Sequence, residues 1–168
     1  MPRPLVVLDV VGLTGDLLKH TPRLAAVAAS GWQAPLVPVL PAVTCCVQST
    51  FLTGLPPSGH GVVGNGWYFR DLAQVMFWRQ SNGLVGGEML WEAARHRWPG
   101  FRTAQLFWWF NMYCTAEISL TPRPAYPADG RKIPDAYSRP ASLARELQAE
   151  LGTFPLFNFW GPTAGIRS

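Results

Sequence analysis

The chain has 168 residues, the length of one ordinary domain with enough sequence for a hydrophobic core. Hydrophobic residues make up 48% of it and charged residues only 14%, a lower charged fraction than a typical soluble domain carries. The net charge of +4 comes from 14 Lys and Arg against 10 Asp and Glu, and the basic residues are scattered without a run. This pattern argues against a protein that binds a nucleic-acid polymer.

Cysteine usage and the absence of a targeting pattern predict a cytoplasmic protein. Cys45 and Cys46 are adjacent and Cys114 is distant, which is a poor basis for a disulfide framework and suits a reducing compartment. The apolar run near the start is interrupted by Asp9 and is too short for a secretory signal. No stretch approaches the ~20 apolar residues of a membrane span, so we expect no membrane partner.

In chain order, the first part is predicted to contain two strand–helix units. Residues 5–11 form a β-branched apolar run typical of a strand buried on both faces, and residues 24–29 form an alanine-rich helical run that ends at a glycine. Residues 36–40 predict a second strand, and Pro41 interrupts the chain after it. Residues 44–52 then have helical character and again end at a glycine.

The second part is predicted to continue with a hairpin, two helices and two strands. Two aromatic runs within residues 61–78 indicate the hairpin. Helical spacing predicts helices over residues 87–98 and 142–151, and apolar runs predict strands over residues 103–110 and 154–159.

Strands that alternate with helices predict an α/β sandwich with a mainly parallel sheet. Its least ordered part is expected to be the proline-rich loop of residues 120–140. A parallel strand in this architecture feeds a crossover helix, yet the chain stops soon after its last predicted strand. We therefore expect the chain to be the N-terminal part of something longer.

Residues 59–64 match the G-x-G-x-x-G spacing of a dinucleotide-binding loop. That loop requires a preceding strand and a following helix, so that the pyrophosphate meets the helix N-terminus. Here prolines precede the glycines and an aromatic run follows them. We interpret the stretch as a glycine-rich turn.

Two polar residues stand out near the ends of the two predicted strands of the first part, one inside the first strand and one a few residues after the second. Asp9 lies toward the end of its strand, where open parallel sheets present their sites, and is either a structural acid with backbone donors or a metal ligand. Thr44 begins the second helix, so sheet geometry could place it beside Asp9. Its hydroxyl would either cap the helix or, with a metal that lowers its pKa, act as a nucleophile beside a helix N-terminus that binds anions.

The adjacent cysteines compete with Thr44 for the role of nucleophile, because a thiolate at a helix start has a depressed pKa. No partner histidine is evident close by, since His20, His60 and His96 are interpreted as structural or surface residues. We therefore interpret Cys45 and Cys46 as small buried hydrophobic residues.

Two stretches resemble a known family: VVLDVVGL and then PAVTCCVQSTFLTGLPPSGHGVVGNGWYFRD. They look like the N-terminal part of the alkaline phosphatase superfamily, in the branch of type I phosphodiesterases/nucleotide pyrophosphatases and phosphonoacetate hydrolases. The specific features are a strand-end Asp, Pro-x-x-Thr, a helix that ends in Thr-Gly, and His-Gly-x-x-x-Asn. They cover residues 4–71, and the remaining chain is compatible but less diagnostic.

The resemblance implies a three-layer α/β sandwich and a hydrolase of phosphodiester, pyrophosphate or phosphonate bonds in a small-molecule substrate. It implies two zinc ions, with Asp9 and Thr44 among their ligands and Thr44 as the metal-activated nucleophile. The Thr44 alkoxide would attack phosphorus in line, and water at the second metal would release the phosphothreonine. Asn65 would donate a hydrogen bond to a phosphoryl oxygen, and His60 matches a position that shapes the turn.

The chain also departs from the family's pattern. Cys45-Cys46-Val47-Gln48 stands where secreted relatives often have Phe-Pro-Asn-His, which leaves the subfamily and the substrate open. The family's other zinc ligands are Asp and His residues from later segments, yet Asp129 and Asp135 lie in the proline-rich loop without nearby histidines. Catalytic zinc takes about three protein ligands. We therefore expect the missing ligands beyond Ser168, residues 1–168 to be the N-terminal part of one catalytic domain, and the isolated chain to be inactive.

Other functions stay open at this stage. Trp67, Tyr68 and the aromatic residues 107–113 could line a pocket that selects the leaving group, although aromatic strands more often pack in cores. A non-catalytic binding module on the same fold is the main alternative, and a cysteine-dependent enzyme is another. An uncovered sheet edge and 8 tryptophans predict self-association.

Overall fold

The computed structural model describes residues 4–159, and the chain divides into two units. These are the N-terminal unit (Met1–Pro38) and the larger unit (Val39–Ser168). All five strands that the described residues form belong to the larger unit. The prediction that residues 1–168 belong to one catalytic domain stays a prediction.

The N-terminal unit contains two helices, α1 (Gly15–Leu18) and α2 (Pro22–Ser30). The Thr14 hydroxyl accepts a hydrogen bond from the Leu17 N–H and caps α1. The proline at the start of α2 suits the first helical turn, where its missing N–H has no partner to lose. The helix ends before Gly31, which confirms the helix predicted over residues 24–29.

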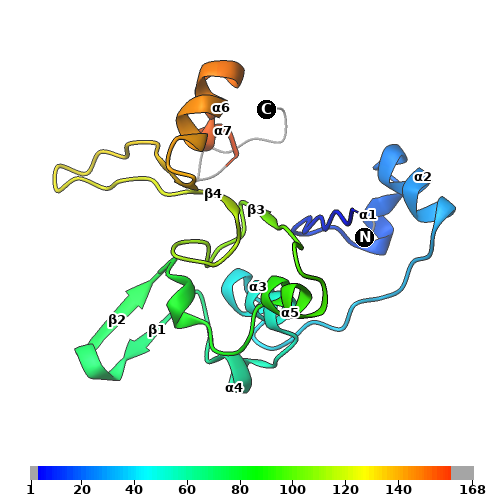
Figure 1. Ribbon diagram of the computed structural model, residues 1–168, viewed down its shortest axis with the longest axis horizontal. Coiled ribbons are helices and arrows are strands. Elements are labelled where there is room, and N and C mark those ends of the chain that lie inside the picture. The colour runs from blue at the N-terminus through cyan, green and yellow to red at the C-terminus, as the bar shows by residue number, and fades with distance from the viewer. Residues whose placement is uncertain (1–3, 160–168) are drawn as a thin grey trace. The chain divides into compact units, whose positions relative to one another are not determined.

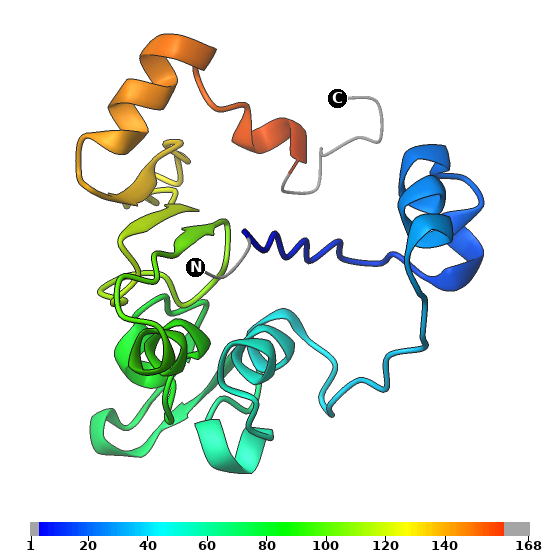
Figure 2. The ribbon, with the colours of Figure 1, turned by 45° about the vertical axis from the view of Figure 1, so that its right-hand side comes forward.

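The strand predicted over residues 5–11 is wrong for this structure. Residues 4–10 run without regular secondary structure (Figure 2), and Leu5 and Val6 expose 80% and 77% of their surface. A strand exists only through its hydrogen-bonded neighbours, and the sheets of the described residues are built from later segments alone. The apolar composition was therefore not sufficient to make a strand here.

The strand predicted over residues 36–40 is not present either. Pro38 stands in its middle and cannot donate a ladder hydrogen bond, and prolines also flank it on both sides. The β-branched residues between these prolines remain exposed, with Val37 at 87%.

The larger unit alternates short helices and strands (Figure 1). Its elements in chain order are α3 (Thr44–Thr53), α4 (Pro57–His60), β1 (Gly66–Phe69), η1 (Arg70–Leu72), β2 (Gln74–Phe77), η2 (Asn82–Leu84), α5 (Leu90–Arg97), β3 (Ala104–Leu106), β4 (Ile118–Pro122), β5 (Ala136–Arg139), α6 (Leu143–Leu151) and α7 (Leu156–Phe159). The protein is therefore of mixed α/β class, as predicted.

Helix α3 confirms the helix predicted over residues 44–52. Cys45, Ser49 and Leu52 recur at helical spacing and are buried, so one stripe of α3 faces the core. Gly54 ends the helix with a φ of 70°, a left-handed conformation that favours glycine, and its N–H donates to the Thr50 carbonyl at 2.8 Å.

Apolar side chains of α3, α5 and the segment before β4 make the core of the larger unit. Its buried members are Cys45, Cys46, Leu52, Val62, Val85, Met89, Trp91, Phe110, Cys114 and Ala116. The core therefore packs directly beneath the helix that begins at Thr44.

Strands β1 and β2 form the predicted aromatic hairpin, in which Gly66 pairs with Phe77. A Cβ atom at Gly66 would lie 2.3 Å from the Phe77 ring, so no larger residue fits this register. Ala73 has a φ of 48° and turns the chain between the two strands. The register of the hairpin is thus fixed at the residue directly after Asn65.

The second sheet has the order β3-β4-β5, with β3 parallel and β5 antiparallel to β4. The proline-rich segment of residues 120–140 was predicted to be a loop without strands, and this is wrong. It forms the β4–β5 hairpin, which a bridge between Ala125 and Ile133 extends. The prolines fit because Pro122 occupies the last position of β4 and Pro140 follows β5, where no ladder N–H is needed.

Two further strand predictions were wrong because the backbone leaves the extended conformation. The strand predicted over residues 103–110 shortens to β3, because Phe107 has a φ of 63° and bends the chain away. The strand predicted over residues 154–159 is the helical turn α7. Pro155 directly precedes this turn, and its carbonyl accepts from the Asn158 N–H at 3.0 Å.

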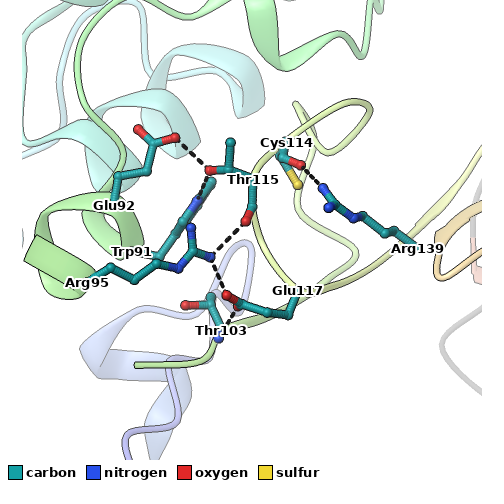
Figure 3. Close-up of polar contacts among 8 residues, drawn as sticks. All are labelled: Trp91, Glu92, Arg95, Thr103, Cys114, Thr115, Glu117 and Arg139. Atoms are coloured by element: carbon teal, nitrogen blue, oxygen red, sulfur yellow. Dashed lines mark hydrogen bonds and ion pairs between the residues drawn. The ribbon is translucent and has the colours of Figure 1, made fainter. Parts of the chain in front are cut away.

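Helices α5 and α6 confirm the remaining helix predictions, and polar contacts hold α5 to the segment before β4 (Figure 3). The Trp91 Nε1–H donates to the Thr115 hydroxyl at 2.8 Å, and that hydroxyl donates to Glu92 at 2.6 Å. Arg95 pairs with Glu117 at 2.7 Å and also donates to the Thr115 carbonyl at 2.7 Å.

Candidate functional site

Thr44 is the first residue of α3, which confirms that it begins a helix. The interpretation of Thr44 as the helix cap is wrong, because Val43 holds that position with an extended backbone (φ −119°, ψ 157°). One residue further in, the Thr44 hydroxyl cannot cap the helix. Within residues 4–159 this hydroxyl makes no hydrogen bond, so it is available to a ligand.

Asn65 lies beside Thr44, because its Oδ1 accepts a hydrogen bond from the Cys45 backbone N–H at 3.0 Å. The contact joins residues twenty positions apart and ties the start of β1 to the first turn of α3. Since Oδ1 faces this donor, the Nδ2 amide group points elsewhere, and no described residue accepts from it. The structure therefore brings together two of the three predicted site residues.

The N-terminus of α3 adds a positive electrostatic potential to this pair. The first N–H groups of a helix have no partner within the helix, and the aligned peptide dipoles attract negative charge there. Val43 supplies no side-chain cap. A tetrahedral anion at this end would meet backbone N–H groups, the Thr44 hydroxyl and the Asn65 amide.

Cys45 and Cys46 are buried, with 1% and 0% exposure, which confirms their interpretation as small hydrophobic residues. Burial, together with the neighbouring Cys46, raises the pKa of the Cys45 thiol to about 12. Burial also raises the pKa of Cys46, whose thiol donates to the Val62 carbonyl at 3.2 Å. Neither group is a thiolate at neutral pH, which argues against a cysteine nucleophile.

His60 is fully buried and holds the turn that leads to Asn65. Its Nδ1 accepts from the Val62 N–H at 3.1 Å, so the proton lies on Nε2, which contacts the Thr50 hydroxyl at 3.0 Å. Burial lowers the pKa of this ring, which therefore stays neutral. Both nitrogens are occupied, in agreement with a residue that shapes the turn.

The glycine spacing of residues 59–64 is a turn, as interpreted from the sequence. The short helix α4 includes the first of these glycines and β1 follows the last, the reverse of the strand and helix that a dinucleotide loop requires. Gly61 has a φ of 78° and ends α4.

The sequence analysis did not identify Gln48, which connects the helix of the site to Trp109. Its buried Oε1 accepts from the Trp109 backbone N–H at 2.7 Å, and Gln48 lies one helical turn after Thr44. The sequence feature that could have identified it is a glutamine on the buried side of a helix, where a polar side chain needs a hydrogen-bond partner. Trp67 packs against the core and Tyr68 is 55% exposed.

Asp9 belongs to the N-terminal unit and is exposed. Its proximity to Thr44 stays a prediction. Among residues 4–159 no three His, Cys, Asp or Glu side chains are grouped as a metal site. Asp129 pairs with Arg131, Asp135 accepts from the Ala136 N–H, and His96 pairs with Glu88. The described residues thus do not fit a complete zinc site.

One protein-family model covers almost the whole chain. The family model of type I phosphodiesterase / nucleotide pyrophosphatase matches residues 5–167. The chain belongs to this family. Its members are hydrolases of phosphodiester and pyrophosphate bonds, and the match includes Thr44, Asn65 and the glycine turn between them. No solved structure matches the chain.

The described helices are all short. None of those within residues 4–159 is both long and apolar enough to cross a membrane.

Proposed function

We propose that this member of the family hydrolyses phosphodiester, pyrophosphate or phosphonate bonds of a small-molecule ester through Thr44 as the nucleophile. The observation that supports this best is the 3.0 Å contact between Asn65 Oδ1 and the Cys45 N–H. It holds an amide donor beside a hydroxyl that no described residue binds, at the start of a helix.

The reaction has two displacements. In the first, Thr44 Oγ1 loses its proton to solvent and forms a bond to phosphorus, while the bond from phosphorus to the leaving group breaks. The leaving group departs with the electron pair and takes up a proton. In the second, a water oxygen attacks phosphorus, the bond to Thr44 breaks, and the threonine recovers its proton.

The chain's own contribution is to stabilise charge on the phosphoryl oxygens. The Asn65 Nδ2–H group would donate to one non-bridging oxygen. The N–H groups of the first turn of α3, other than that of Cys45, which Asn65 binds, would face another. Both sets of donors sit on elements that buried contacts fix, so they need little reorganisation during the reaction.

Two zinc ions, with Asp9 and Thr44 among their ligands, belong to the proposal because of the family membership. No step above uses a metal, since the described residues do not complete the ligand set. Metal analysis of the purified complete gene product tests this part: we expect bound zinc that Asp9→Asn reduces, and an unchanged zinc content would remove Asp9 from the ligand set.

We also propose the three-layer sandwich with a mainly parallel sheet for the whole catalytic domain. The parallel pairing of β3 with β4 supports it. Three reduced cysteines favour a cytoplasmic location. Exposed aromatic residues such as Trp32 and Phe77 favour self-association.

The test is hydrolysis of bis(4-nitrophenyl) phosphate and a phosphonate ester by the complete gene product. Thr44→Ala should lower kcat/KM by at least about 10³-fold, because the nucleophile is lost. Thr44→Ser keeps a hydroxyl and should retain part of the activity. If Thr44→Ala hydrolyses both esters at the wild-type rate, Thr44 is not the nucleophile. If the wild type binds these esters without turnover, the fold serves as a non-catalytic binding module.

A further inference from the structure

We infer that the larger unit holds a binding pocket for an aromatic group that carries a negative charge and a hydrogen-bond donor. The pocket has a volume of about 420 Å³. The residues that define its chemistry are Trp78, Arg79, Gln80, Trp109, Arg123 and Tyr126. They come from the segments that follow β2, β3 and β4, which the two sheets hold in place.

The charge of the pocket is positive. Arg79 and Arg123 both line it, and no acidic residue does. Within residues 4–159 neither guanidinium forms an ion pair with a carboxylate, whereas Arg95 and Arg131 each do. Two guanidinium groups that line one pocket repel each other, and an anionic group bound between them would relieve that repulsion.

The walls are aromatic and fixed. The rings of Trp78 and Trp109 lie 5.1 Å apart with an interplanar angle of 70°. The Trp109 Nε1–H donates to the Arg79 carbonyl at 2.9 Å, which fixes the orientation of its ring. Such walls favour a planar ligand, because indole faces and edges pack well against rings.

Trp78 has an unusual backbone. Its φ of 54° lies in the left-handed region, which a bulky aromatic residue rarely adopts. Its N–H donates to the Asn65 carbonyl at 2.8 Å, a bond that keeps this conformation. Backbone strain of this kind is concentrated at ligand sites, where it positions a side chain.

Gln80 adds an unsatisfied acceptor. Only 9% of it is exposed, and its Nε2 donates to the Pro122 carbonyl at 2.9 Å. The buried Oε1 has no hydrogen-bond partner among the described residues. A buried acceptor without a donor costs stability. Because this oxygen is closed off from the open pocket, a ligand N–H or O–H group would reach it by a rotation of the Gln80 side chain.

The pocket is joined to the proposed catalytic site by two hydrogen bonds. Trp78 binds the Asn65 carbonyl, and the Trp109 N–H binds Gln48, one turn after Thr44. On the proposed function, the pocket would hold a charged aromatic part of the substrate. That assignment alone rests on the proposed function, and the ligand site itself does not.

Calorimetric titration of the complete gene product with 4-aminobenzenesulfonate tests the ligand site. A sulfonate carries the ring, the negative charge and the N–H donor but no phosphorus, so binding is read without hydrolysis. We expect saturable binding at one site, weaker binding of benzenesulfonate, which lacks the donor, and the weakest binding of aniline and methanesulfonate.

Three variants assign the site. Arg79→Gln and Arg123→Gln should each weaken binding by about tenfold, since each removes a charge-assisted hydrogen bond. Arg145→Gln, at an exposed arginine of α6 outside the pocket, should leave binding unchanged. Equal affinity for aniline, or wild-type affinity in both pocket variants, would overturn the proposal.

The substrate assignment has its own readout. Arg79→Gln should raise the KM for an aryl phosphodiester with a carboxylate on its ring, with kcat unchanged, and should leave the KM for the unsubstituted ester unaltered. Thr44→Ala should bind the sulfonate like the wild type. Absence of hydrolysis by the wild type, with intact sulfonate binding, would refute the proposed function only. Absence of sulfonate binding by a wild type that hydrolyses the esters would refute the pocket only.

Discussion

Two apolar segments of this chain behave differently in the structure. Residues 44–65 form a helix and a turn that buried contacts hold together, whereas residues 4–10 have a more apolar sequence and stay exposed. In the first segment, Gly54, His60 and Asn65 form hydrogen bonds with residues of the same segment, at most twenty positions away along the chain. In the second, regular structure depends on strands from elsewhere in the chain. Local hydrogen bonds therefore decide which part of the motif is formed.

Hydrogen exchange on the purified protein tests whether the two segments differ in stability. Amides in the middle of α3 should exchange at least about a hundredfold more slowly than those of residues 5–10, because buried helical bonds open rarely. Peptide mass spectrometry measures both segments in one sample. Equal protection would show that residues 5–10 form the strand that their sequence predicts.

Asn65 variants separate the structural and the chemical part of the formed segment. Asn65→Asp keeps the Oδ1 that accepts from the Cys45 N–H but loses the Nδ2 donor. We expect a loss in kcat of about 10²-fold, typical of a lost oxyanion donor, with an unchanged melting temperature. Asn158→Asp, at an exposed position, is the matched control. Unchanged kcat in Asn65→Asp would mean that the amide group has no part in the chemistry.

Gly66→Ala tests whether the register of the hairpin positions Asn65. The added Cβ would lie 2.3 Å from the Phe77 ring and 2.9 Å from the Met76 carbonyl, so the hairpin must shift. Overpacking of this kind costs about 1–3 kcal/mol. Gly83→Ala is the control, since its Cβ would meet the Ser81 hydroxyl at an ordinary 3.6 Å. Denaturant unfolding that gives the same stability for both variants would contradict this reading of the hairpin.

The features that were predicted correctly from the sequence depend on interactions between residues close together in the chain. The start of α3 at Thr44, its end at Gly54, and the rejection of a dinucleotide loop all depend on neighbouring residues. The strand over residues 36–40 failed because Pro38 removes a ladder donor. The pocket beside Asn65 was not predictable, because it needs the left-handed backbone of Trp78 and three segments distant in sequence.

The smallest expected effect concerns the contacts that hold α5 (Figure 3). Burial alone would raise the pKa of Glu92, but hydrogen bonds from Thr115 and the Met89 N–H, with the Arg95 and His96 charges, lower it. The pKa of Glu117 is lowered likewise, against its burial, by the Thr103 N–H, its own N–H and Arg95.

A folded-state pKa below the unfolded value near 4.3 adds stability above about pH 4.3, and protonation removes it as the pH falls. Glu117 and Arg95 are about one third and one quarter exposed, so the contribution is about 1 kcal/mol or less. Glu92→Gln with Glu117→Gln should flatten the decline of the melting temperature in acid, and Glu150→Gln on α6 should not. An unaltered acid decline in the double variant would show that other groups control it.

The central claim is that the hydroxyl at the start of α3 becomes bonded to phosphorus. Acid quenching of the complete gene product during turnover of bis(4-nitrophenyl) phosphate, followed by peptide mass spectrometry, measures this directly. We predict a 4-nitrophenyl phosphate adduct on Thr44 that Thr44→Ala abolishes. An adduct on Cys45 or Cys46, or steady turnover with no adduct on Thr44, would contradict the account.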